Sequence, residues 1–244
     1  IYRHPDKGWI LLPPWAPEPP PDCLTGKCKL QPRWDGGKVA GAFIGTDQYI
    51  RDNVGRHVDA AIEKTLPIAA LAKEEPQLAV SIASRCANAT LDYFARVTPP
   101  HLAREHFQRF DSAIKQLILQ CITPDYAIDP PQGPSRFRLA HQIMELPMRS
   151  NGLGLTSLVQ KSSAGYLASL HACKHDSRFV STIPDLRHHI DSAYDLLRQT
   201  LQTTAIAPTH PITQAIPHSA RFFVSDRPTW RRKTFKNAQR VVMK

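Results

Sequence analysis

The organisation of this chain is most clearly marked by the stretch LPMRSNGLGL, residues 146–155. Asn-Gly and Gly-x-Gly sequences favour tight turns, because glycine, and to a lesser extent asparagine, adopts positive φ angles at little steric cost. Apolar residues at helical spacing lie on both sides of the stretch, and we expect helices over residues 135–146 and 156–174. The stretch is therefore interpreted as a turn that joins two helices.

Helical periodicity covers most of the remaining sequence. Thr46 or Asp47 can cap a helix that ends before Pro67, and Pro76 can begin a second helix that runs to Pro99. The second helix is expected to bury one stripe, which comprises Leu78, Ile82, Cys86, Ala89, Tyr93 and Val97. The third and the last helix carry stripes of the same period, namely Ala103, Phe107, Phe110, Ile114, Leu117 and Cys121 in the third, and Leu186, Ile190, Ala193, Leu197 and Leu201 in the last.

These segments predict an all-α fold: a bundle of about six helices with extended, Pro-rich and basic arms at both ends. We expect a Pro-rich arm over residues 1–45 with one strand-like segment at 38–44, a helical domain over 46–203 and a basic arm over 204–244. The proline run at residues 13–21 must be extended, because proline fixes φ and lacks an N–H donor. No apolar run reaches the roughly 18 residues that a membrane-spanning helix needs, so no membrane partner is expected.

Four segments, taken in order, carry a family resemblance. They read GKVAGAFIGTDQYI at 37–50, TLDYFARVTPP at 90–100, FDSAI at 110–114, and the LPMRSNGLGL stretch. Together they resemble the C-terminal region of retrotransposon-type reverse transcriptases, downstream of the polymerase palm. Ala40 and Phe43 depart from the family pattern, as does Asn151, which stands where a second glycine is usual. Asparagine tolerates positive φ, so we expect the turn to survive that change.

The resemblance concerns an enzyme whose catalytic part is missing from this sequence. A polymerase needs paired carboxylates that hold two metal ions about 3.5–4 Å apart. The family supplies them in an aromatic-x-Asp-Asp hairpin, and no Asp-Asp dipeptide occurs in these 244 residues. We therefore expect no polymerase activity, no catalytic residue, no cofactor and no small-molecule substrate.

The charge of the chain points to a polyanionic partner. Its 31 Lys and Arg exceed its 21 Asp and Glu and give a net charge of +10, for which RNA is the expected partner. The C-terminal arm combines cations, which can neutralise phosphates, with an aromatic ring that can stack on a base: Arg227, Trp230, Arg231, Arg232, Lys233, Lys236 and Arg240. A solvated tail that binds nothing is the alternative for these residues.

Arg96 is a second candidate contact. It lies in the segment at 90–100, and the resemblance implies that it touches a nucleic-acid backbone. The alternative is a surface arginine whose aliphatic stem covers its own helix.

The sequence contains pairs of possible metal ligands but no complete set for one ion. His171 and His175 lie four residues apart on an expected helix, and Cys23 and Cys28 form another half-site. Adjacent His188 and His189 are weaker still, because neighbouring helical positions diverge by about 100°. No metal is therefore expected.

Two functions remain in competition. The first is a non-catalytic RNA-binding or scaffolding subunit, derived from a reverse transcriptase C-terminal region. It would lie beside neighbouring proteins in a large ribonucleoprotein such as an organellar (mitochondrial) ribosome. The alternative is a thumb fragment of an active retrotransposon reverse transcriptase whose palm is not in this chain. Five cysteines, an odd number, favour a reducing compartment. That compartment is an organelle matrix for the first function, and the nucleus or cytoplasm for the second.

Overall fold

A computed structural model describes residues 9–12, 31–122, 142–146, 150–173 and 183–203. Its residues group into two compact units, Ile1–Arg56 and His57–Lys244, here called the N-terminal unit and the helical unit. The described residues are mainly helical, which confirms the expected all-α class. None of the described helices combines the length and the hydropathy that a bilayer crossing requires.

The N-terminal unit contains two short strand pairs. Strand β1 (Trp9–Leu11) pairs in parallel with β2 (Gln31–Arg33), and β3 (Gly36–Val39) pairs antiparallel with β4 (Ala42–Gly45). The single strand expected at residues 38–44 was therefore wrong, because Ala40 (φ 47°) and Gly41 (φ 89°) form a two-residue turn that divides the segment into a hairpin. Helix α2 (Asp47–Glu63) follows, and the Thr46 hydroxyl accepts a hydrogen bond from the Tyr49 backbone N–H at 3.2 Å, as a helix cap does.

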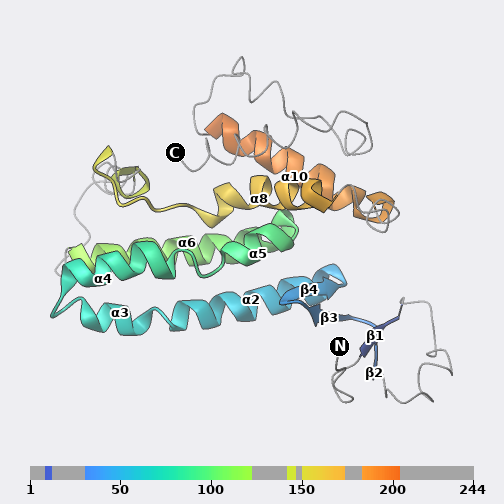
Figure 1. The fold of residues 1–244 in the computed structure, drawn as a ribbon, viewed down its shortest axis with the longest axis horizontal. Helices are drawn as coiled ribbons and strands as arrows, with labels where there is room; N and C mark the ends of the chain where they lie inside the picture. Colours follow the sequence, from blue (N-terminus) through green and yellow to red (C-terminus); the bar gives the residue numbers. More distant parts are fainter. Residues whose placement is uncertain (1–8, 13–30, 123–141, 147–149, 174–182, 204–244) are drawn as a thin grey trace. The chain divides into compact units, whose positions relative to one another are not determined.

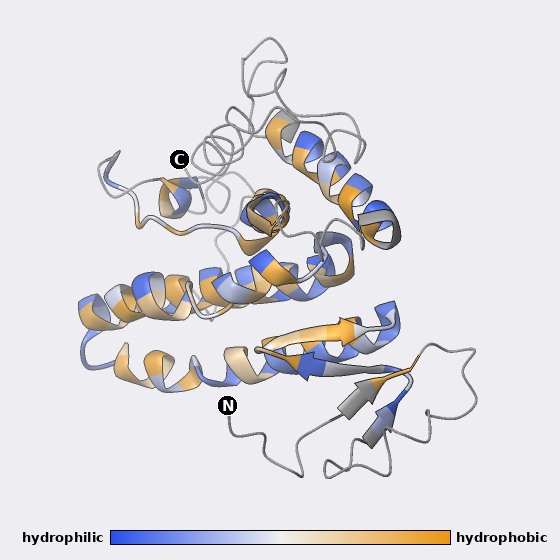
Figure 2. Ribbon diagram, turned by 45° about the vertical axis from the view of Figure 1, so that its right-hand side comes forward, coloured by the Kyte–Doolittle hydropathy of each residue, from blue (hydrophilic) through white to orange (hydrophobic). Residues whose placement is uncertain are grey.

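Helices make up the described part of the helical unit. After the end of α2 come α3 (Leu66–Leu71), α4 (Pro76–Ile82), a π-helical turn η1 (Ala83–Ala87) and α5 (Asp92–Val97), followed by α6 (Pro100–Ile122), α8 (Leu158–Cys173) and α10 (Ile183–Thr203). Most of these helices carry hydrophobic residues on part of their surface and hydrophilic residues on the rest (Figure 2). The stripes expected for the third and the last helix lie in the core, although Leu186 is only partly buried.

The second expected helix differs from the prediction. It is interrupted by the π-turn and by a turn at residues 88–91, so α4 and α5 are separate. Its expected core stripe was wrong, since Leu78 and Tyr93 are 50% and 44% exposed. The buried positions are instead mostly small, namely Ala79, Ala83, Ala87, Leu91, Phe94 and Ala95. A face built mainly of alanine gives a weak hydropathy signal, which explains the error.

Helix α8 is the centre of the helical unit. It packs against α5, α6 and α10 and lies between them in Figure 1. Seven consecutive residues, 161–167, are buried, so this part of α8 is enclosed around its full circumference. A helix enclosed in this way needs protein partners for its polar groups, because water cannot reach them.

The N-terminus of α8 finds those partners in Asp111, a residue of α6. The Asp111 carboxylate accepts hydrogen bonds from the backbone N–H groups of Leu158 (2.8 Å) and Val159 (3.2 Å), and from the Ser157 hydroxyl (2.6 Å). Ser157 in turn accepts from the Gln160 N–H at 3.2 Å. Burial raises the pKa of the Asp111 carboxyl, and its hydrogen bonds oppose that rise. The backbone N–H groups of Leu158, Val159 and Gln160, which have no hydrogen-bond partner within α8, thus bind to side-chain oxygens.

The turn before α8 folds back on the residues that precede it. The Leu146 carbonyl accepts from the Gly154 N–H at 2.9 Å, and the Met144 carbonyl accepts from the Leu155 N–H at 3.0 Å. Asn151 has φ 61°, which confirms that asparagine takes the left-handed conformation there. Of the helix expected over 135–146, residues 142–145 are helical and the part before residue 142 lies outside the described residues.

Replacing Gly152 by Ala should destabilise the fold by about 1–3 kcal/mol, because of overpacking. A Cβ atom at residue 152 would lie 2.0 Å from the Leu146 carbonyl oxygen. Gly165→Ala is a matched control with the opposite expected sign. Its Cβ would lie 3.5 Å from the nearest atom, in the middle of α8, where alanine is favoured over glycine by about 0.5–1 kcal/mol. Urea denaturation measures both changes, and equal effects would contradict the prediction.

Replacing Asp111 by Ala should lower the free energy of unfolding by about 2–3 kcal/mol, because three hydrogen bonds to a partly buried carboxylate are lost. Asp59→Ala is the control, since Asp59 pairs with Arg109 at 2.8 Å and both side chains are more than half exposed. Such an exposed pair contributes roughly 1 kcal/mol or less. Thermal or urea denaturation that finds the two variants equally stable would refute a structural role for the Asp111 cap.

Candidate nucleic-acid interface

An ion pair with a buried lysine joins α5 to α8. Lys161 of α8 is 6% exposed, and its ammonium donates to the carboxylate of Asp92, the first residue of α5, and to the Thr156 hydroxyl at 3.1 Å. The buried side-chain amide of Asn88 also lies within hydrogen-bonding distance of Thr156. A charge so well buried needs such a partner, because removal from water is costly for an unpaired ion. These contacts fix the position of α5 against α8.

The same ion pair determines the surroundings of Arg96. Asp92 and Arg96 lie four residues apart on α5, a spacing at which opposite charges commonly pair on a helix. Asp92 is instead bound to Lys161, and no carboxylate of the described residues forms an ion pair with Arg96. Arg96 is exposed, and a Cβ at Gly165 would lie 3.7 Å from its Cγ. Its aliphatic stem therefore lies beside α8 at Gly165.

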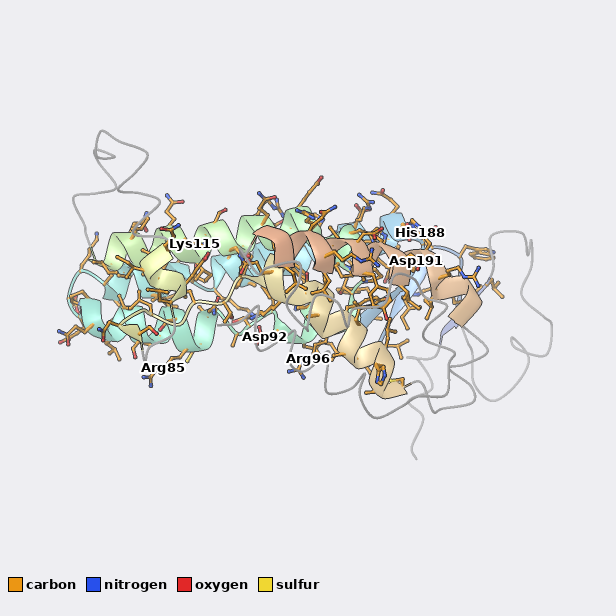
Figure 3. The ribbon with its side chains drawn as sticks, turned by 90° about the horizontal axis from the view of Figure 1, so that it is seen from above. Arg85, Asp92, Arg96, Lys115, His188 and Asp191 are labelled. Atoms are coloured by element: carbon orange, nitrogen blue, oxygen red, sulfur yellow. The ribbon has the colours of Figure 1, made fainter. Side chains whose placement is uncertain are left out.

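Arg85 supplies a second exposed cation. It lies in the π-turn η1, an irregularity that occurs often at functional sites. Within the described ranges no carboxylate forms an ion pair with it. Figure 3 shows Arg85 and Arg96 projecting from the same long side of the helices. Together, Arg85 and Arg96 form the arginine face.

Three other cations of the helical unit are ion-paired with acidic residues. The ion pairs are Arg109–Asp59 at 2.8 Å, Lys115–Glu145 at 2.5 Å and Arg198–Asp195 at 2.6 Å. A paired cation offers little attraction to a phosphate, because the neighbouring carboxylate offsets its field. The arginine face is therefore better suited than these pairs to meet a polyanion.

The structure describes only some of the residues singled out from the sequence. Arg227, Trp230, Arg231, Arg232, Lys233, Lys236 and Arg240 lie outside the described residues, as do Cys23, Cys28 and His175. His171 is buried within α8, whereas Cys173, two residues later, is exposed. Among the residues predicted from the sequence to contact nucleic acid, Arg96 is the only one within the described ranges. The resemblance located Arg96, whereas Arg85 lies outside the four resembling segments.

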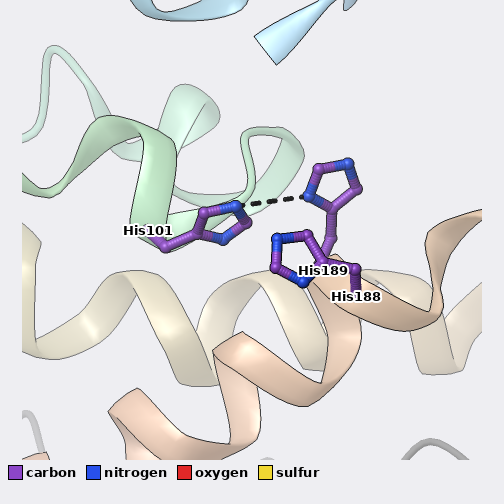
Figure 4. Close-up of side chains that lie close together, drawn as sticks. All are labelled: His101, His188 and His189. Atoms are coloured by element: carbon purple, nitrogen blue, oxygen red, sulfur yellow. Dashed lines mark hydrogen bonds between the residues drawn. The ribbon is translucent and has the colours of Figure 1, made fainter.

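A cluster of three histidines was missed from the sequence. His101, the second residue of α6, faces His188 and His189 of α10 (Figure 4). One ring nitrogen of each lies within 4.8 Å of the others. His188 and His189 are adjacent on α10, and His101 lies close to both of their rings. The contact joins residues 88 positions apart, so no local spacing could have shown it.

Comparison with known proteins adds no further assignment. Searches of protein families, of curated proteins and of solved structures find no match to this chain. The function of the chain is therefore inferred from its residues and their geometry.

Proposed function

We propose that this chain is a non-catalytic RNA-binding and scaffolding subunit, related to the C-terminal region of reverse transcriptases. It would work within a large ribonucleoprotein, such as an organellar (mitochondrial) ribosome, in contact with neighbouring proteins. The arginine face is the observation that carries the proposal. Two exposed guanidinium groups on one side, without acidic partners among the described residues, provide phosphate contacts that the ion-paired cations do not.

Overall charge supports the same partner. A net charge of +10 attracts any polyanion at long range, whereas the arginine face would determine where the RNA backbone is held. The described cysteines Cys86, Cys121 and Cys173 are free thiols, which suits a reducing compartment. Because phosphate contacts carry no sequence information, binding through this face should be largely independent of sequence.

A second candidate is the thumb of an active reverse transcriptase. It is favoured because two of the resembling segments contact the helix that follows a third. Asp92 from residues 90–100 pairs with Lys161 of α8, and Asp111 from residues 110–114 caps α8, which follows the LPMRSNGLGL stretch. The encoding transcript distinguishes the two candidates. An upstream reading frame with an aromatic-x-Asp-Asp hairpin would favour the enzyme, and its absence would favour the subunit.

Replacing Arg85 and Arg96 together by Ala should weaken RNA binding and its salt dependence. Each lost phosphate contact should reduce the slope of log K against log salt by about 0.7 for single-stranded RNA, or about 0.9 for a duplex. A salt titration of RNA affinity with the full chain measures the slope. Both residues are exposed, so the free energy of unfolding should change by no more than about 0.5 kcal/mol each.

Arg109→Ala is the matched control for that experiment. It also removes an exposed arginine, but one that is already paired with Asp59, so the salt slope should stay as in the wild type. If the control lowers the slope about half as much as the double variant does, which is the same amount per removed charge, net charge rather than the arginine face governs binding. An unchanged slope in the double variant would exclude these two residues as phosphate contacts.

The C-terminal arm should contribute independently of the arginine face. The triple substitution Arg231→Ala, Arg232→Ala and Lys233→Ala should weaken binding equally for all RNA sequences and lower the slope by about 0.7 per lost contact to a single strand. Trp230→Ala should cost about 1–3 kcal/mol of binding free energy if its ring stacks on a base. A triple variant that keeps its RNA affinity but loses a neighbouring protein would show that the arm docks on protein instead.

A further inference from the structure

The three histidines of the helical unit form a nearly regular triangle. The ring centres of His101 and His188 are 5.2 Å apart, those of His101 and His189 are also 5.2 Å apart, and those of His188 and His189 are 5.6 Å apart. Nδ1 of His189 lies 3.4 Å from Nε2 of His101. His188 is exposed and the other two are partly buried, so solvent can reach the cluster from one side.

These separations are close to those of a tetrahedral zinc site. A zinc–nitrogen bond of about 2.05 Å at tetrahedral angles places two ligand nitrogens about 3.3 Å apart. An imidazole centre lies about 1.15 Å beyond its nitrogen, which puts two ring centres roughly 5.2 Å apart around one ion. The triangle therefore has the dimensions that three imidazoles adopt around a single zinc ion. The ring nitrogens lie within 4.8 Å of one another, so ligation would draw them closer together, toward a separation of about 3.3 Å.

The chemistry of the cluster also suits zinc. Imidazole is the commonest protein ligand of zinc and binds it in its neutral form. Calcium and magnesium prefer oxygen ligands, so a site made of three nitrogens selects a transition metal.

We propose that His101, His188 and His189 bind one zinc ion, with water in the fourth position. The ion would join the beginning of α6 to α10 across 88 residues of sequence. It would thereby hold α10 against the core at a point separate from its apolar contacts with α8. This inference is independent of RNA binding, because it uses none of the residues of the arginine face.

The test uses the full chain without an affinity tag, stripped of metal with a chelator. Calorimetric titration with zinc should give one ion per chain, and cobalt should give the intense visible absorption of a tetrahedral site. Zinc at about a hundred times its Kd should raise Tm by about 5–10 °C. His188→Ala and His189→Ala should each weaken zinc binding by about tenfold or more. His188 is exposed, so its replacement should leave the far-ultraviolet circular dichroism unchanged.

Two controls make the assignment specific. His106→Ala removes a histidine of the same helix that lies outside the cluster, and should leave zinc affinity and the cobalt spectrum unchanged. The pair Cys23→Ser and Cys28→Ser should likewise leave them unchanged. Wild-type affinity in the double variant His188→Ala and His189→Ala would overturn the proposal. Loss of binding in the cysteine pair alone, or an octahedral cobalt spectrum in the wild type, would also overturn it.

Discussion

The helical unit depends on the burial of α8 around its full circumference. A helix in that position gains apolar contacts on every side, but its backbone and polar side chains lose access to water. Two carboxylates from other helices bind polar groups of α8. Asp111 accepts hydrogen bonds from backbone N–H groups at its N-terminus, and Asp92 accepts one from the ammonium of Lys161. Both contacts also fix the direction and register of α8, because a hydrogen-bonded cap does not tolerate a shift along the axis. The apolar faces of α5, α6 and α10 can then pack against a helix with one defined position.

The same arrangement shapes the surface of the unit. Asp92 is the natural helical neighbour of Arg96, and by pairing with Lys161 it leaves that arginine exposed without an acidic partner among the described residues. One internal requirement, the charge of a buried lysine, thus changes the electrostatics of an external face. The presence of an exposed cation cannot be judged from the net charge alone, since Arg109, Lys115 and Arg198 are equally basic in sequence and yet are neutralised in the fold.

Helices α6 and α10 could be predicted from sequence because each is long and carries large apolar residues at regular spacing. The interruption between α4 and α5 could not, since its buried face consists largely of alanines whose spacing resembles that of any helix. The Asn151 conformation was predictable because backbone preference is local. The Asp111 cap and the histidine cluster were not, because each unites residues from distant helices and neither leaves a local pattern. Arg96 was found through resemblance alone, and its surroundings became apparent only from the fold.

The distance in sequence between Asp111 and the N-terminus that it caps has a consequence for how the chain is made. Asp111 precedes Ser157 by 46 residues, so α6 leaves the site of synthesis well before the helix that it supports. At about 5–20 residues per second, the 62 residues from Asp111 to Cys173 take roughly 3–12 s to be added. During that interval the apolar sides of α5 and α6 that α8 later covers lack this cover. Exposed apolar surface makes the nascent chain prone to aggregation, and slow translation of residues 112–173 would lengthen that exposure.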